Sequence, residues 1–314
     1  FQKTGEWGAT YVSYFEEFFA NPLGREFLWF FYCKFIGGIT NYSYEAFTFI
    51  TYMMIFSLSA YLAFLVCESG RYNFSLMLFA LIFFEMTFID TGYDLWRNIV
   101  SILIFFVGVM KYFSSHSRLI SRILIYSSVF IHITTLPVLC LFELYALFMN
   151  RNNQYVSLKS FVSVKIILMA TISIILGLYV SGLIVEMFGS NINNPIYKGI
   201  NLFKEIKSNE FNFLKYMRPF YIMFIAYIAL NWKNVSHFDI FIIFIFIVIQ
   251  FLDHLTSNLA MVFSRASIAN YIGILFITMK LFERFDYKYT VAFVFLIFIL
   301  RMNYYSDSSN LFFF

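Results

Sequence analysis

The sequence predicts an all-α fold, a polytopic transmembrane helical bundle with interfacial amphipathic helices. Hydrophobic residues make up 61% of the 314 residues and charged residues only 13%, which is about half the share that soluble domains carry. Charge-free runs at 46–67 and 166–185 are each long enough to cross about 30 Å of hydrocarbon as a helix. Only a bilayer favours so much uninterrupted apolar length.

We interpret residues 1–314 as a single membrane domain, because no linker or internal repeat divides them. Its expected parts are interfacial aromatic helices at 1–43, membrane helices at 44–185 and 219–305, and a polar external loop at 186–218. Since the chain opens at Phe1, we expect a further membrane segment to precede it. Nine candidate spans lie at 44–66, 72–89, 95–113, 119–149, 161–185, 219–232, 238–252, 265–280 and 288–303.

Charge and cysteine usage exclude several classes of protein. The formal net charge of +4 is spread along the chain without a polybasic block, which argues against nucleic-acid binding. Cys33, Cys67 and Cys140 are odd in number and far apart, so they predict packing residues and not a disulfide framework. No two histidines have metal-ligand spacing and no Gly-rich phosphate loop occurs, so we expect no metal and no cofactor.

Arg97 opens an apolar segment of the kind that forms a membrane helix. Thr91 and Asp94 have the spacing of a capping box, which places Arg97 in the first turn or two of that helix. One interpretation is an Asp94–Arg97 ion pair that anchors the helix end. The other is that Arg97 lines a polar cavity and binds a phosphate-bearing substrate with its planar fork.

His132 lies inside the next apolar segment and is followed by Thr134, Thr135 and Pro137. Span 119–149 either crosses once or breaks here and returns to its side of entry, and we prefer the break because proline removes a helical hydrogen bond. The histidine is either a structural residue bonded to nearby backbone or a proton acceptor near neutral pH. The break favours a polar cavity and hence the second interpretation.

Later polar residues add a second group. Arg265 follows Asp253 and His254 at the start of the eighth span, and it would lie about two turns into a helix that Thr256 or Ser257 could cap. A structural role is the other interpretation of Asp253 and His254. His116 and His237 fall in short polar loops and are expected to be solvated. The Lys and Arg residues divide evenly between the two sides, so charge does not decide orientation. A break at His132 would bring Arg97, His132, Arg265 and the 186–218 loop to one face.

These features follow one another in a recognisable order, and that order resembles a known family. The elements are Gly5-Glu6-Trp7 with Tyr11, the aromatic stretch 26–39, Arg97 with the basic loop 111–122, His132 through Pro137, and Arg265 followed by Tyr271. They resemble the EpsG-like branch of bacterial polysaccharide polymerases, the Wzy-type enzymes that join lipid-linked repeat units. Glu6 replaces the usual Asp of that pattern, and Asn98-Ile99 replaces the usual Gln-Gly.

The resemblance implies a GT-C-like membrane glycosyltransferase architecture in the bacterial inner membrane, with chemistry on the periplasmic side. The growing glycan on undecaprenyl diphosphate would be the donor, and a hydroxyl of an incoming lipid-linked unit the acceptor. Besides this lipid-linked oligosaccharide, the implied partners are membrane lipid and a chain-length regulator protein. The implied catalytic residues are Arg97, His132 and Arg265, with Asp90, Asp94, Arg218 and His254 binding substrate and no metal.

Two other functions use the same residues. A transporter or flippase for a lipid-linked or anionic solute would bind it with these arginines without cleaving a bond, and it would favour internal symmetry, of which the sequence shows none. A membrane acyltransferase would use His132 as a base. It would need a companion Asn, Asp or Glu in a motif, and none is visible in the sequence.

Overall fold

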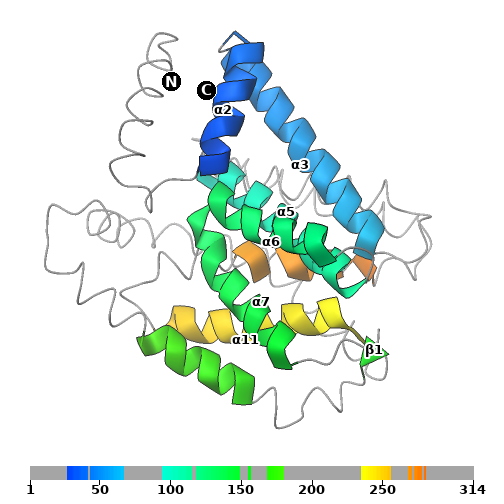
Figure 1. Cartoon of the computed structure of the whole chain (residues 1–314), viewed down its shortest axis with the longest axis vertical. Helices are drawn as coiled ribbons and strands as arrows, with labels where there is room; N and C mark the ends of the chain where they lie inside the picture. The colour runs from blue at the N-terminus through cyan, green and yellow to red at the C-terminus, as the bar shows by residue number, and fades with distance from the viewer. Residues whose placement is uncertain are drawn as a thin grey trace, which may run out of the picture.

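The structure is a computed structural model that describes residues 27–41, 43–66, 94–114, 118–148, 155–156, 168–179, 235–255 and most of 268–280 (Figure 1). These residues are almost entirely helical, which confirms the all-α prediction for this part of the chain. The labelled helices are α2 (Phe27–Ile39), α3 (Tyr44–Val66), α5 (Asp94–Phe113), α6 (Arg118–Ile131), α7 (Leu136–Phe148) and α11 (His237–Leu255). Further helical segments cover Leu168–Tyr179 and Ile268–Ile277. Strands β1 (Tyr155–Val156) and β2 (Val235–Ser236) form one short antiparallel pair.

The turn between α2 and α3 follows from local chemistry. Asn41 adopts a left-handed φ of 49°, which asparagine tolerates at a helix end. Ser43 then caps α3, since its Oγ accepts the Ala46 N–H at 3.3 Å. Tyr32 of α2 shares a 2.9 Å hydrogen bond with Thr51 of α3. The predicted aromatic helix is therefore confirmed as a helix, and its place at a membrane interface stays a prediction.

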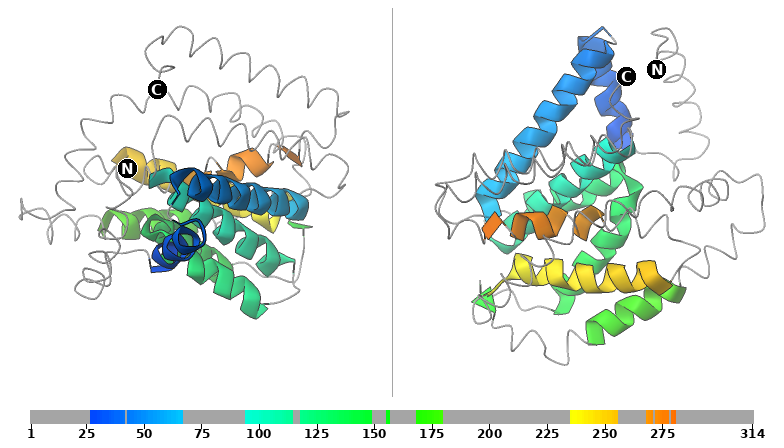
Figure 2. Two further views of the ribbon diagram at one scale, coloured as in Figure 1. Left: turned by 90° about the horizontal axis from the view of Figure 1, so that it is seen from above. Right: turned by 180° about the vertical axis from the view of Figure 1, so that it is seen from behind.

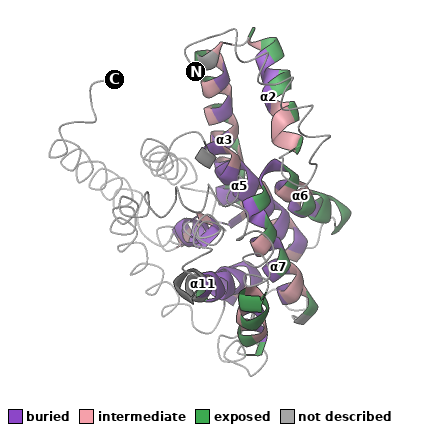
Figure 3. Cartoon of the chain, turned by 90° about the vertical axis from the view of Figure 1, so that its left-hand side faces the viewer, coloured by how far each residue is buried: buried purple, intermediate pink, exposed green. Residues whose placement is uncertain are grey.

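Helix α5 lies in the centre of the described bundle (Figure 3). It packs most extensively on α6 and α3. A Cβ at Gly108 would lie 2.7 Å from Ile125 Cγ1 and 3.0 Å from Ser121 O, so glycine allows α5 and α6 to approach closely. Ser101, which precedes Gly108 on α5, donates to the carbonyl of Ser128, which follows Ile125 on α6, at 2.7 Å. The two helices therefore run antiparallel.

The predicted break in span 119–149 is confirmed. Helix α6 ends at Ile131, His132 is extended with φ −152° and ψ 122°, and a 3₁₀ turn over Ile133–Thr135 leads into α7. Helix α7 then runs back beside α6, because Tyr126 donates to Glu143 Oε1 at 2.9 Å. We call residues 132–135 the tip of this α6–α7 hairpin.

An aromatic core joins α5, α7 and α11. Phe142 of α7 contacts Phe105 and Phe241 edge to face, with ring centroids 6.0 and 5.7 Å away. Phe113 stacks on His237, the first residue of α11, at 5.2 Å. The prediction that His237 is solvated is therefore wrong, since this contact leaves the residue only 4% exposed.

The cysteines divide between two outcomes. Cys33 is buried on α2, as predicted for a packing residue, whereas Cys140 on α7 is exposed, so that prediction is wrong for Cys140. Its position on the outer side of the hairpin explains the difference, because the neighbouring Leu136 and Leu147 of α7 are exposed as well. Cys67 lies outside the described residues.

Several neighbouring helices of the bundle run in opposite directions, so the start of one lies beside the end of another (Figures 1 and 2). Phe113 at the end of α5 meets the start of α11, while Phe105 meets Phe241 further along, so these helices run in opposite directions. The segment Ile268–Ile277 is also antiparallel to α11, because Gly273 lies against Ile242 and Lys280 reaches Ser236. We call the end that holds the start of α5 and the tip the tip end, and the opposite end the cap end.

Candidate functional site

A buried polar group fills the contact between the tip and the first turns of α5. We call it the tip cluster, and every member is at most 9% exposed. Polar side chains at this depth are stable only when they are hydrogen-bonded. Its members are Asn98, Ser101, Ser128, His132, Thr134 and Thr135.

Hydrogen bonds join the tip to α5. Thr134 Oγ1 donates to Asn98 Oδ1 at 3.1 Å. Ser101 Oγ donates to the Ser128 carbonyl, so in its bond with Thr135 it is the acceptor and Thr135 Oγ1 donates. Asn98 and Ser101 are one helical turn apart on α5, and they therefore hold two consecutive threonines of the tip.

His132 lies at the junction of these elements. Its backbone N–H donates to Ser128 O at 3.0 Å, and its own carbonyl accepts the Thr135 N–H at 3.1 Å. The residue is 2% exposed and its ring Nε2 is buried. An outside hydroxyl therefore reaches this nitrogen only after the groups that cover it shift.

Arg97 lies in the first turn of α5, which confirms the predicted position on the helix. It is half-buried and precedes Asn98, the residue that holds Thr134. The structure thus brings Arg97 and His132 onto elements that touch. A guanidinium can bind an anion and an imidazole can accept a proton, so these touching elements carry both kinds of group.

The other predicted site residues are less closely placed. Asp94 is the first residue of α5, and His254 lies in the last turn of α11. That turn points toward the tip end, as does the end of Leu168–Tyr179, where Gly177 lies against Leu252. Asp90, Arg218 and Arg265 lie outside the described residues.

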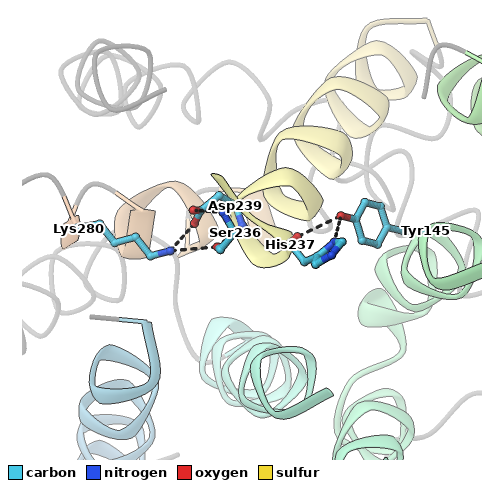
Figure 4. Close-up of polar contacts among 5 residues, drawn as sticks. All are labelled: Tyr145, Ser236, His237, Asp239 and Lys280. Atoms are coloured by element: carbon cyan, nitrogen blue, oxygen red, sulfur yellow. Dashed lines mark hydrogen bonds and ion pairs between the residues drawn. The ribbon is translucent and has the colours of Figure 1, made fainter. Parts of the chain in front are cut away.

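A second polar group, at the cap end, was not predicted from the sequence (Figure 4). Ser236 Oγ accepts the Asp239 N–H and Asp239 Oδ2 accepts the Ser236 N–H, both at 3.2 Å, in a capping box that starts α11. Lys280 donates to Asp239 Oδ1 at 2.7 Å. Beside them, Tyr145 OH lies 3.2 Å from His237 Nδ1. The serine and aspartate three residues apart before an apolar run were the available signal.

Comparison with protein-family models, with curated proteins and with solved structures finds no match to this chain. Among the described residues, no group of three or more His, Cys, Asp or Glu side chains is placed to hold a metal ion. Function therefore has to be inferred from the chemistry of the tip cluster and its neighbour Arg97.

Proposed function

We propose that the chain is a membrane glycosyltransferase that joins oligosaccharide repeat units carried on undecaprenyl diphosphate. It would work at the periplasmic side of the bacterial inner membrane. One observation carries the proposal: the tip that contains His132 is hydrogen-bonded through Thr134 to Asn98, the residue that follows Arg97 on α5. An anion-binding group and a proton acceptor are the two parts that this transfer needs.

Placement in a membrane is supported by length and by exposure. Glu45–Val66 and Trp96–Phe113 are long and apolar enough to cross a bilayer. Helix α3 is the stronger indicator, because it also leaves large apolar side chains exposed, with Phe49 at 66% and Phe64 at 62%. On α2, the exposed side chains Phe27, Phe31, Phe35 and Ile39 recur every four residues and so form one stripe. Such faces are stable against lipid and costly in water.

Several crossings are supported by the direction of the helices. The ring centroids of Trp96, near the start of α5, and Tyr52 of α3 are 5.4 Å apart. Lys111 near the end of α5 lies 5.2 Å from the Tyr61 ring, further along α3. Both helices therefore run the same way, so a chain that crosses the bilayer with both would need a return crossing between them, among residues outside those that the structure describes. The candidate span at 72–89 is long enough for one.

The chemistry would proceed by displacement at the anomeric carbon of the donor sugar. The acceptor oxygen bonds to the anomeric carbon while the bond between that carbon and the phosphate oxygen breaks. The electron pair of the broken bond leaves with the diphosphate. Arg97 would stabilise the charge that builds on the leaving group, together with Arg265 and Arg218. His132 would accept the proton of the attacking hydroxyl or hold that hydroxyl in place.

Purified protein in vesicles with lipid-linked repeat units provides the test, followed by gel analysis of the glycans. A ladder of products supports the proposal. Accumulation of the unit across the vesicle membrane without a ladder would replace it with the transporter function.

An arginine exchange connects the ladder to the site. Arg97→Lys should lose most of the ladder, because an ammonium cannot form the bidentate contact with phosphate oxygens. Arg122→Lys is the matched control, since the Arg122 side chain is 50% exposed and pairs with Glu143 away from the tip. Equal losses in both variants would separate Arg97 from the reaction.

A further inference from the structure

We infer that Thr134 and Thr135, held by Asn98 and Ser101 of α5, are positioning residues that fix His132 relative to Arg97. The inference rests on the proposed function where it concerns turnover. Where it concerns the geometry of His132, it rests only on the contacts of the tip.

The backbone at His132 explains why such fixing is needed. His132 is a single extended residue between the end of α6 and a one-turn 3₁₀ segment. Its backbone N–H and carbonyl are both hydrogen-bonded, but its φ and ψ are not helical, so regular helix geometry does not set the direction of its side chain. Its direction depends on the anchors before and after it.

The anchor before His132 is a backbone hydrogen bond, whereas the anchors after it are side-chain hydrogen bonds. Before His132, its N–H donates to Ser128 O, and that carbonyl also accepts from Ser101 Oγ of α5. After His132, the main anchors to α5 are the side-chain bonds of Thr134 and Thr135. Hydroxyl contacts to one helix thus set both flanks of the histidine.

The same helix carries Arg97. Because Asn98 follows Arg97 directly, a shift of the Thr134–Asn98 contact changes the separation between the imidazole and the guanidinium. Catalytic groups are sensitive to such shifts, and a misplacement of about 1 Å can cost about 10²-fold in rate. The threonine bonds therefore act on turnover and not on the affinity for the donor.

The test replaces the hydroxyl with an isosteric methyl group. Thr134→Val should lower kcat by between about 10-fold and 10²-fold, while donor affinity stays within about twofold. Thr134→Ser keeps the hydroxyl and should restore turnover. Thr48→Val is the matched control, because Thr48 Oγ1 is also buried but makes no hydrogen bond within the described part of the chain.

A spectroscopic measurement reports on His132 directly. The chain has 4 histidines, so ¹⁵N-histidine labelling gives few imidazole signals, and His132→Gln identifies the one from His132. In Thr134→Val this signal should shift or broaden, whereas Thr134→Ser and Thr48→Val should leave it unchanged. Unchanged kcat together with an unchanged signal in Thr134→Val would overturn the inference.

Two further outcomes are decisive. If Thr134→Val yields no folded protein, Ser101→Ala is measured in the same way, and loss of folded protein in both variants would overturn the inference by making the contacts purely structural. If the wild-type protein makes no polymer, the proposed function fails, and the His132 signal alone then decides whether the threonines position the ring.

Discussion

Lys280 Nζ lies 2.7 Å from Asp239 Oδ1 at the cap end, with the two side chains 11% and 1% exposed. The same ammonium donates to Ser236 Oγ at 3.2 Å. The lysine, which follows the segment Ile268–Ile277, therefore binds the capping box of α11. A pair this far from water is sensitive to the loss of either partner, because the remaining charge is left uncompensated.

Lys280→Met should therefore destabilise the fold by about 3–5 kcal/mol. Adding Asp239→Asn should recover much of this loss, because asparagine is neutral and still accepts the Ser236 N–H. Chemical unfolding in detergent measures both variants. Lys34→Met on the exposed side of α2 is the control and should stay within about 0.5 kcal/mol of the wild type. A double variant no more stable than Lys280→Met would contradict the account.

The contact between α5 and α6 can be tested with a single methyl group. Gly108→Ala should destabilise the fold by about 1–3 kcal/mol, because the added Cβ meets Ile125 Cγ1 at 2.7 Å and backbone atoms of α6 at 3.0 Å. Gly38→Ala adds the same group on α2, where no atom of the described residues lies within 4 Å, and should be neutral or slightly stabilising. Similar unfolding curves for the two variants would show that α5 and α6 are not packed this closely.

Much of the described fold could be predicted from composition and local pattern. The span at 44–66 coincides with α3 because its apolar run is long and free of charge. The break before Pro137 was predictable because proline removes a helical donor, and it occurs at His132. These features depend on residues close together in the chain.

Contacts between distant residues could not be predicted in the same way. Thr134 and Asn98 are 36 residues apart and Lys280 and Asp239 are 41 apart, so each pairing depends on how helices align in the bundle. His237 looks solvated from its polar neighbours in the sequence, and only the stacking of Phe113 shows that it is buried. Arg97 and His132 were individually predictable as polar residues in apolar segments, whereas the α5 side chains that hold the tip were not.

The proposed orientation places Arg97 and the 186–218 loop on the periplasmic side and the loop after α5 on the cytoplasmic side. In a variant without native cysteines, cysteine at Asn193 should react with an impermeant thiol reagent in intact spheroplasts. Cysteine at Ser117 should react only after the membrane is opened. Equal labelling of the two positions in intact spheroplasts would rule out this orientation.

His132 is where catalysis and packing predict different behaviour. As a base or hydroxyl-binding group, it should matter for turnover, so His132→Ala should lower polymer formation by about 10²–10⁴-fold while the donor still binds. If His132 is instead a packing residue, His132→Ala should lower the free energy of unfolding, because the side chain is buried. Polymerisation assays and unfolding curves on the same preparation separate these outcomes.

His132→Gln then separates the two catalytic roles. Glutamine keeps a hydrogen-bonding side chain but cannot accept a proton near neutral pH as imidazole does. If the histidine is a general base, His132→Gln should be as slow as His132→Ala, whereas a positioning role predicts that His132→Gln keeps a large part of the wild-type rate. Full polymerisation in His132→Ala would show that His132 is not part of the site. Arg97 would then be the remaining proposed catalytic residue at the tip end.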